Sequence, residues 1–233
     1  MVDLSARAAG PEWMDGDDVP ADVYAACIED LARVNRATLA YRPTLDFVAR
    51  AMAGEGRRLT LLDIGFGAGD MLREIAELAK RRGWNLRLVG IDINPRSAPV
   101  AERLTPADTS IEYLTGDAYD WPADEPLDLV VSSLVTHHME DADIERLLRW
   151  MEARTARGWF VNDLHRSAIA YHGFRAMAAA ARWHPFVRHD GPLSVARSFR
   201  RADWQARLQA AEVEDVARLR WWVPFRYCVE RLK

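Results

Sequence analysis

The sequence predicts an α/β fold in which a doubly wound parallel sheet carries helices on both faces. From Leu59 onward, short apolar segments alternate with amphipathic ones, as in parallel strands joined by crossover helices. The first apolar segment runs directly into a glycine-rich turn at residues 65–69. With 233 residues, 49% of them hydrophobic, the chain is long enough for one such sheet and an additional helical piece.

The expected elements of the sheet region follow one another regularly. Apolar runs predict strands near 59–64, 86–92, 111–114, 127–133 and 157–163. Helical spacing of apolar residues predicts helices near 69–82, 96–103 and 141–154. Beyond the fifth strand we expect a long helix at about 166–182, an irregular stretch at 183–192, a helix at 201–211, and closing strands near 213–222 and 225–232.

Two helices are expected before the glycine turn. Apolar residues recur at helical spacing after Pro20, and a second such run begins at Pro43. Residues 1–19 have no such period and suggest a loose lead-in. We therefore divide the chain into an N-terminal helical cap, residues 1–57, and a main domain, residues 58–233, with a helical insertion at about 166–211.

The glycine turn carries the most specific signal in the sequence. Gly65, Gly67 and Gly69 lack a Cβ atom, so the backbone can take positive φ values and approach a ligand closely. The helix that follows offers free N–H groups and the positive end of its dipole. This order of strand, turn and helix is typical of a cofactor-binding site.

Two aspartates indicate which cofactor the turn suits. A dinucleotide fold spaces its glycines as G-x-G-x-x-G, whereas the sixth position counted from Gly65 is Asp70. A carboxylate there repels a pyrophosphate but can accept a hydrogen bond from an ammonium group. Asp63 adds a second negative charge just before the turn. The turn therefore favours a ligand with a cationic group over a diphosphate.

The acidic residue and the three glycines resemble the loop of class I S-adenosylmethionine-dependent methyltransferases, which has the pattern acidic-x-G-x-G-x-G. Segments 86–92, 111–118 and 127–138 match the same family in the same order, so the resemblance spans residues 59–163. It implies a Rossmann-like, doubly wound sheet of seven strands with the last strand antiparallel. It also implies S-adenosylmethionine as the methyl donor and S-adenosylhomocysteine as the product.

The resemblance further implies where the cofactor binds. Asp92 ends the second strand and is expected to accept both ribose hydroxyls. Asp117 lies beside the adenine, and the end of the fourth strand lines the methionine half of the cofactor. The implied cofactor-binding residues are Asp63, Gly65, Phe66, Gly67, Gly69, Asp92, Ile93, Asp117, Ala118, Ser133 and Leu134.

Two consecutive histidines, His137 and His138, follow the fourth strand at the carboxyl edge, where open α/β sheets place their ligands. Methyl transfer from a sulfonium is an in-line displacement, and an oxygen or nitrogen nucleophile has to lose its proton. Histidine suits this step because its pKa lies near neutrality. We expect one of the two to act as general base or to orient the substrate. Alternatively, His137 packs against the cofactor and His138 hydrogen-bonds a loop.

A second polar segment, residues 162–166, follows the fifth strand at the same edge. It resembles a subgroup of the family that acts on phenolic, quinone or polyketide-like small molecules. His165 is expected to contact the substrate and is the third candidate catalytic residue. Arg166 is expected to form an ion pair with Asp163 and to take no part in the chemistry.

Two more groups of residues are candidates for an acceptor pocket. Residues 188–192, with Ser194 and Arg197, are rich in polar groups for a connection between helices, although they could instead cap the next helix. The second group has aromatic faces that could line the pocket or belong to the core, and comprises Tyr171, His172, Phe174 and Arg175.

Composition argues against several classes of partner. A net charge of −4 and a pI near 5.9 give no general attraction to nucleic acid. No segment approaches about 18 unbroken apolar residues, so no membrane partner is expected. Cys27 and Cys228 lie far apart and suggest neither a disulfide framework nor a metal cluster. We expect a cytoplasmic protein. A homodimer is compatible with the sequence, which does not determine the oligomeric state.

Missing motifs narrow the acceptor further. Relatives that methylate nucleic-acid amino groups carry Asn or Asp, two prolines and an aromatic residue after the fourth strand, where this chain has Ser-Ser-Leu at 132–134. Cytosine C5 enzymes need a cysteine after a proline, and neither cysteine follows one. The acidic metal-binding set of catechol-type enzymes is missing at 137–139, so no metal is expected.

These observations predict methyl transfer to a small, aromatic organic acceptor. The first interpretation is O-methylation of a phenolic or polyketide-derived hydroxyl. C-methylation of a quinone or phenol ring is an alternative that can use the same histidines. A protein that binds the cofactor but transfers nothing is an alternative of another class, and Asp70 disfavours an NAD-dependent reductase.

Overall fold

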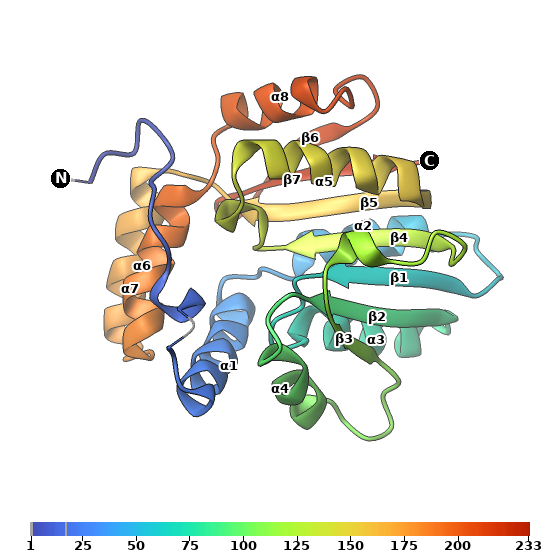
Figure 1. Cartoon of the computed structure of the whole chain (residues 1–233), viewed down its shortest axis with the longest axis horizontal. Helices are drawn as coiled ribbons and strands as arrows, with labels where there is room; N and C mark the ends of the chain where they lie inside the picture. Colours follow the sequence, from blue (N-terminus) through green and yellow to red (C-terminus); the bar gives the residue numbers. More distant parts are fainter. Residues whose placement is uncertain (1, 17) are drawn as a thin grey trace.

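The strands of the protein form one twisted sheet (Figure 1). The computed structural model describes residues 2–16 and 18–233. Within them the sheet has the order β3-β2-β1-β4-β5-β7-β6. Its strands are β1 (Leu59–Ile64), β2 (Leu86–Asp92), β3 (Glu112–Thr115), β4 (Leu127–Ser133), β5 (Thr155–Leu164), β6 (Arg218–Trp222) and β7 (Arg226–Leu232). β1 to β5 are parallel, and β7 is antiparallel to both of its neighbours. The predicted fold class is confirmed.

The central strands bury both faces because helices cover the sheet on two sides (Figure 1). One layer contains α5 (Asp141–Arg154) and α8 (Arg201–Ala210), and the other contains α2 (Arg42–Ala51), α3 (Asp70–Arg82) and α4 (Ser97–Leu104). Leu62 and Val130 belong to the first core, whereas their neighbours Leu61 and Val131 belong to the second. This alternation of side chains along each strand explains why apolar residues follow one another in the sequence of the central strands.

Three more helices lie beyond the carboxyl ends of the parallel strands: α1 (Ala21–Ala37), α6 (Ala168–Ala180) and α7 (Pro185–Arg197) (Figure 1). A 3₁₀ helix, η1 (Trp13–Asp15), is bound to α7, because the Asp190 carboxylate accepts the N–H groups of Trp13 and Met14 at 2.9 and 3.0 Å. Part of the predicted loose lead-in is therefore an ordered turn. Within the described residues, none of the helices is long and apolar enough to cross a membrane.

The largest departure from the predicted elements is α7. The prediction of an irregular stretch at 183–192 is wrong, because the helix runs through Gly191 and Pro192. Pro185 begins it with a suitable fixed φ, and His184 Nδ1 accepts the N–H of Phe186 at 3.3 Å. Gly191 packs against the Phe174 ring, which leaves no room for a side chain. Other boundaries shift by a few residues, and the last two strands begin at Arg218 and Arg226.

Candidate active site

A cavity of about 1330 Å³ lies at the carboxyl edge of the sheet and is also lined by residues of α1, α6 and α7. Its lining includes ten of the eleven residues predicted to bind the cofactor, all except Gly69, and the three candidate catalytic histidines. These residues come together because the carboxyl ends of parallel strands lie at the same edge of the sheet. The glycine turn together with Asp63, Asp70 and Asp92, which we call the donor loop, thus faces the same cavity as the histidines.

Gly67 and Gly69 have different structural roles in the turn. Gly67 has a φ of +52°, and a Cβ there would meet no atom within 4 Å, so this part of the cavity wall stays open. Gly69 has a φ of +72° and is the N-cap of α3, where a Cβ would lie 2.4 Å from the Tyr113 hydroxyl. Gly69 is therefore required for the turn and its packing, and it does not line the cavity.

Asp63 places an unsatisfied carboxyl in the cavity wall. The residue is 2% exposed, and its Oδ1 has no hydrogen-bond partner in the described part of the chain. Burial, and then the charges of Asp70 and Asp92, raise the pKa of Asp63 well above its usual value. A ligand ammonium group would satisfy this carboxyl, which is the fit expected for the methionine end of S-adenosylmethionine.

The other two carboxylates of the donor loop are already hydrogen-bonded. Asp92 accepts the N–H groups of Gly67 and Asn94, each at 2.9 Å, and burial raises its pKa. It keeps free lone pairs for ribose hydroxyls, because each carboxylate oxygen has two. Asp70 Oδ2 accepts Asn35 Nδ2 at 3.0 Å and the Tyr41 hydroxyl at 2.8 Å. Asp70, which the sequence suggested for an ammonium group, therefore ties the N-terminal helices to α3.

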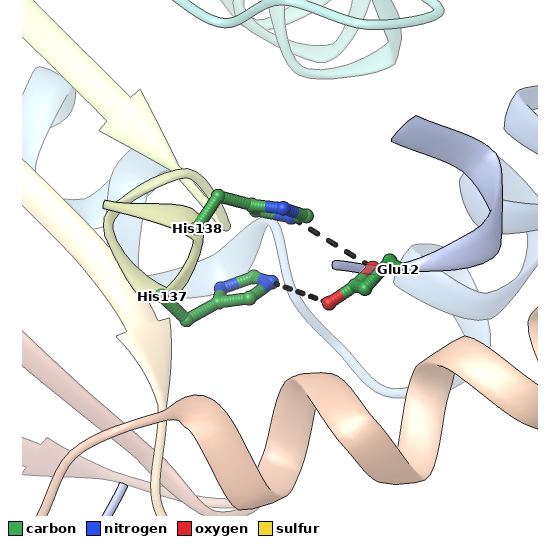
Figure 2. Close-up of side chains that lie close together, drawn as sticks. All are labelled: Glu12, His137 and His138. Carbon is green, nitrogen blue, oxygen red and sulfur yellow. Dashed lines mark ion pairs between the residues drawn. The ribbon is translucent and has the colours of Figure 1, made fainter. Parts of the chain in front are cut away.

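Glu12, His137 and His138, which we call the histidine cluster, lie together in the cavity wall (Figure 2). The histidines belong to the 3₁₀ helix η3 (Thr136–His138), and Glu12 immediately precedes η1. His137 Nε2 lies 3.7 Å from Glu12 Oε1, and His138 Nε2 lies 3.9 Å from Glu12 Oε2. Glu12 is 3% exposed, and burial raises its pKa to about 7.

Asp163 orients His137 through contacts to its Nδ1 atom and its backbone N–H. His137 Nδ1 lies 2.8 Å from Asp163 Oδ1, while Asp163 Oδ2 accepts the N–H of His137 at 2.9 Å and the hydroxyl of Thr136. Burial alone would raise the pKa of Asp163, but His137 and these hydrogen bonds lower it to about 2. Because an ionised carboxylate only accepts hydrogen bonds, His137 Nδ1 is the donor, and Nε2 is the nitrogen that faces Glu12.

His138 is oriented in the same way by Asp15, whose Oδ2 lies 3.1 Å from its Nδ1. On the other side of the cluster, the Ser194 hydroxyl donates to Glu12 Oε1 at 2.8 Å. The sequence analysis did not identify Glu12 or Asp15. Both lie in an N-terminal segment without apolar periodicity, and only the packing of this segment against α7 brings them to the cluster. No local motif could have revealed them.

The predicted ion pair between Arg166 and Asp163 is wrong. Arg166 Nη2 lies 2.9 Å from Asp203 Oδ2, and its Nε donates to the Leu4 carbonyl at 3.1 Å. Asp163 is already occupied by donors from Thr136 and His137. Arg166 therefore connects the first residues to α8, and it is not among the residues that line the cavity.

His165 lines the cavity without belonging to the histidine cluster. Trp221 Nε1 donates to its Nδ1 at 3.2 Å, so the ring's own proton lies on Nε2 when the imidazole is neutral. Burial, and then the charges of Arg200 and Arg166, lower the pKa of His165 and favour this neutral form. His165 is therefore better suited to donate a hydrogen bond to a substrate than to remove its proton.

Replacing His165 with alanine is expected to raise the KM for the acceptor about 2- to 12-fold, the value of one neutral hydrogen bond, with a smaller change in kcat. Steady-state kinetics with varied acceptor would measure it. His172→Ala is the control, because His172 is exposed and absent from the cavity lining. Unchanged KM and kcat in His165→Ala would refute substrate contact.

The candidate acceptor residues divide into two groups. Phe174, Asp190, Gly191 and Ser194 line the cavity. The candidates that do not line it are Tyr171, His172, Arg175, Arg188, His189 and Pro192. Arg197 supports the site from outside, donating to the carbonyls of His137 and His138, both at 3.1 Å. The polar part of α7 therefore serves the cavity and does not form a connection.

Arg226 is a buried cation that sequence reasoning missed. It begins β7, lines the cavity and is 2% exposed. Its Nη2 donates to Thr38 Oγ1 at 3.3 Å, whereas Nε and Nη1 have no partner among residues 2–16 and 18–233. Burial lowers its pKa.

Residues 61–158 match the family model of the methyltransferase domain. Trans-aconitate 2-methyltransferase of Mycobacterium tuberculosis is 27% identical over 157 residues, which cover 66% of this chain and 55% of that protein. The enzyme of the same name from Streptomyces avermitilis is 27% identical over 158 residues, covering 64% and 57%. The chain thus spans little more than half the length of these curated relatives.

Solved structures with the same fold include the plantazolicin methyltransferase BpumL, bound to a desmethylPZN analogue and S-adenosylhomocysteine. It has a TM-score of 0.64 and 12% identity, and the alignment covers 91% of this chain and 96% of that one. Magnesium protoporphyrin IX methyltransferase from Synechocystis PCC 6803, solved with S-adenosylmethionine, gives a TM-score of 0.53 at 14% identity over 95% and 88%. Residues 61–158 thus match a methyltransferase domain, and the strand order of the sheet agrees with the fold of these solved structures.

Proposed function

We propose that the protein transfers a methyl group from S-adenosylmethionine to the hydroxyl oxygen of a small aromatic acceptor. The observation that carries this proposal is that the glycine turn and the histidine cluster line the same cavity. Its volume of about 1330 Å³ exceeds the usual range of a single small-molecule pocket, about 300–1,000 Å³, and suits a cofactor together with an acceptor.

The donor end of the cavity supports S-adenosylmethionine as the ligand. Asp63 offers a buried acceptor for the ammonium group, Asp92 offers carboxylate oxygens for the ribose, and Gly67 leaves the wall open. Ile93, which is 79% exposed, would pack against the adenine. The cofactor would supply an electrophilic methyl group, and the chain would hold the nucleophile in line with it and exclude water.

The acceptor end supports an apolar, ring-shaped substrate. Its walls come from three helices beyond the strand ends and include Ile28, Leu31, Phe174, Met177 and Val187. The histidine cluster adds a polar patch to this lining. An aromatic ring would bury its faces against the apolar side chains and direct its hydroxyl toward the cluster.

The chemical step would form the O–CH₃ bond as the S–CH₃ bond breaks, releasing S-adenosylhomocysteine. The hydroxyl proton would leave at the histidine cluster, where Asp163 holds His137 with Nε2 toward Glu12. C-methylation of an activated ring stays an alternative, since it also needs a proton removed from the acceptor. The relatives named for trans-aconitate suggest that a non-aromatic acceptor also belongs in the screen.

Calorimetric titration with S-adenosylmethionine, S-adenosylhomocysteine and NADH is the first test. We expect the two adenosyl ligands to bind one to one, NADH not to bind, and Asp92→Ala to weaken adenosyl binding about 10-fold or more. Binding of NADH alone would overturn the assignment. The protein is then incubated with methyl-labelled cofactor and a panel of phenols, quinones and carboxylic acids. NMR of the product distinguishes O-methyl from C-methyl groups, and no transfer to any member would favour a binding protein.

A further inference from the structure

We propose that the histidine cluster is a binding site for a first-row divalent metal ion, with Zn²⁺ the ion it suits best. Glu12, His137 and His138 each offer one ligand atom, and these atoms all lie within 4.8 Å of one another. Two imidazoles and one carboxylate are a ligand set of catalytic zinc sites, which keep the remaining position open. The sequence-based expectation of no metal considered an acidic motif after β4 and did not include Glu12.

The geometry of the cluster is close to that of an occupied site. Both histidines present Nε2 to the same carboxylate, at 3.7 and 3.9 Å (Figure 2). Ligands about 2.0–2.2 Å from a tetrahedral zinc ion lie roughly 3.3–3.6 Å apart. The three ligand atoms all lie within 4.8 Å of one another, so side-chain rotations that bring them closer together by at most about 1.5 Å would seat the ion.

The outer contacts of the cluster follow the pattern of metal-bound histidines. Such a histidine usually donates its other ring N–H to a carboxylate or carbonyl, which fixes the ring and raises its basicity. Here Asp163 holds Nδ1 of His137 at 2.8 Å, and Asp15 holds Nδ1 of His138 at 3.1 Å. The third ligand is also held, since the Ser194 hydroxyl donates to Glu12 at 2.8 Å. All three ligands therefore have a partner that fixes their orientation.

The charge around the cluster also favours binding of a cation. Glu12, Asp163 and Asp15 surround the two imidazoles, and Glu12 and Asp163 are 3% and 0% exposed. Asp190 adds a further buried carboxylate nearby on α7. The neighbouring cations Arg7 and Arg197 donate to backbone carbonyls of η3 and not to these carboxylates, and the side chain of Arg7 pairs with Asp141. Buried carboxylates without a compensating cation are unfavourable, and a divalent ion would supply one.

An ion in this position would face the cavity at its open coordination site. With the ion bound, His137 Nε2 would be a ligand and would not take up the proton. An acceptor hydroxyl at the open position would instead release its proton to water more readily, because a bound zinc ion lowers the pKa of an oxygen ligand. The ion would thus act at the place to which the proposed function assigns the acceptor. Ion binding itself does not depend on that function or on the identity of the acceptor.

The test is titration of Zn²⁺ into the full chain after treatment with EDTA and dialysis, followed by calorimetry. We expect one ion per chain. Glu12→Gln and His138→Gln should weaken binding at least about 10-fold, and Asp15→Asn, which removes an outer contact, about 10- to 100-fold. His172→Gln is the matched control on the exposed face of α6 and should bind as the wild type does. Co²⁺ in place of Zn²⁺ should give visible absorption bands that are lost in the ligand variants.

Less than one ion per chain, or equal affinities in Glu12→Gln, His138→Gln and His172→Gln, would overturn the proposal. Circular dichroism and binding of S-adenosylhomocysteine show whether each variant is folded. His138 is 29% exposed, so its substitution is the least disruptive and decides the outcome if Glu12→Gln does not fold. A failed screen for acceptors would leave the ion titration unaffected, and a failed ion titration would leave cofactor binding and methyl transfer open to their own tests.

Discussion

His137→Gln is expected to lower kcat for methyl transfer about 10²- to 10⁴-fold, the usual contribution of a group that assists proton transfer. His137 presents Nε2 inside the cluster, and glutamine of similar reach can neither take up a proton nor replace an imidazole ligand. The affinity for S-adenosylhomocysteine should change much less than kcat, because Asp63 and Asp92, the proposed acceptors of its ammonium and ribose groups, lie on β1 and β2. Steady-state kinetics with an acceptor from the panel, together with calorimetry of the product, would separate the two effects.

Asp163→Asn tests how His137 is held. The amide can donate to Nδ1, which would place the ring proton on Nε2 and turn the cavity-facing nitrogen into a donor. We expect a loss of kcat approaching that of His137→Gln and a changed pH profile, which a purely structural role would not produce. His172→Gln is the control for both variants. If His137→Gln retained most of its turnover, the histidine cluster would have no part in the chemical step.

Asp63→Asn is expected to stabilise the ligand-free protein and to weaken cofactor binding. At neutral pH the variant should melt about 2 to 10 °C higher, because the amide removes a buried charge without a partner, which costs about 1–3 kcal/mol or more. Its affinity for S-adenosylhomocysteine should fall about 10- to 100-fold, since an amide replaces the charged acceptor of the ammonium group. Thermal melts with and without the ligand, and calorimetry, would measure both.

The pH dependence of this effect has a defined sign. The pKa of Asp63 is raised in the folded chain, so the folded state binds this proton more tightly than the unfolded state. The contribution of protonated Asp63 to the free energy of unfolding is fully present below the unfolded pKa of about 3.9. It is lost as the pH rises through the higher pKa of the folded state. The difference in melting temperature between Asp63→Asn and the wild type should therefore grow from pH 4 to pH 8. Asp124→Asn, at an exposed position before β4, should show no such trend, and a constant difference would contradict the assignment.

Most of the fold could be predicted from the sequence because the central strands are buried on both faces. β1, β2 and β4 leave predominantly apolar runs, and their predicted bounds agree with the structure. α7 could not be predicted, because Gly191 and Pro192 interrupt helices in most settings. Here the close contact of Gly191 with Phe174 selects the helix, and that contact depends on tertiary packing.

The two halves of the candidate site differ in the same way. The donor loop is local, so its glycines and acidic residues appear together in the sequence and carry a recognisable pattern. The histidine cluster and the carboxylates that orient it combine residues from the N-terminal segment, η3 and the end of β5. The sequence drew attention to His137, His138 and Asp163, but Arg166 was expected as the partner of Asp163. Neither Glu12 nor Asp15 could be placed beside them without knowledge of how η1 docks on α7.

Arg226 gives the cavity wall a buried positive charge in addition to the buried carboxyl group of Asp63. The wall contains one buried carboxyl group without a partner, Asp63, and one buried guanidinium group with two unpartnered nitrogens in the described chain, Arg226. A zwitterion carries the complementary charges, and the amino-acid end of S-adenosylmethionine is one. A ligand that reached both groups would relieve two separate electrostatic penalties of the ligand-free protein at once. Loss of such a ligand would restore both penalties, so the protein without it is expected to be the less stable form.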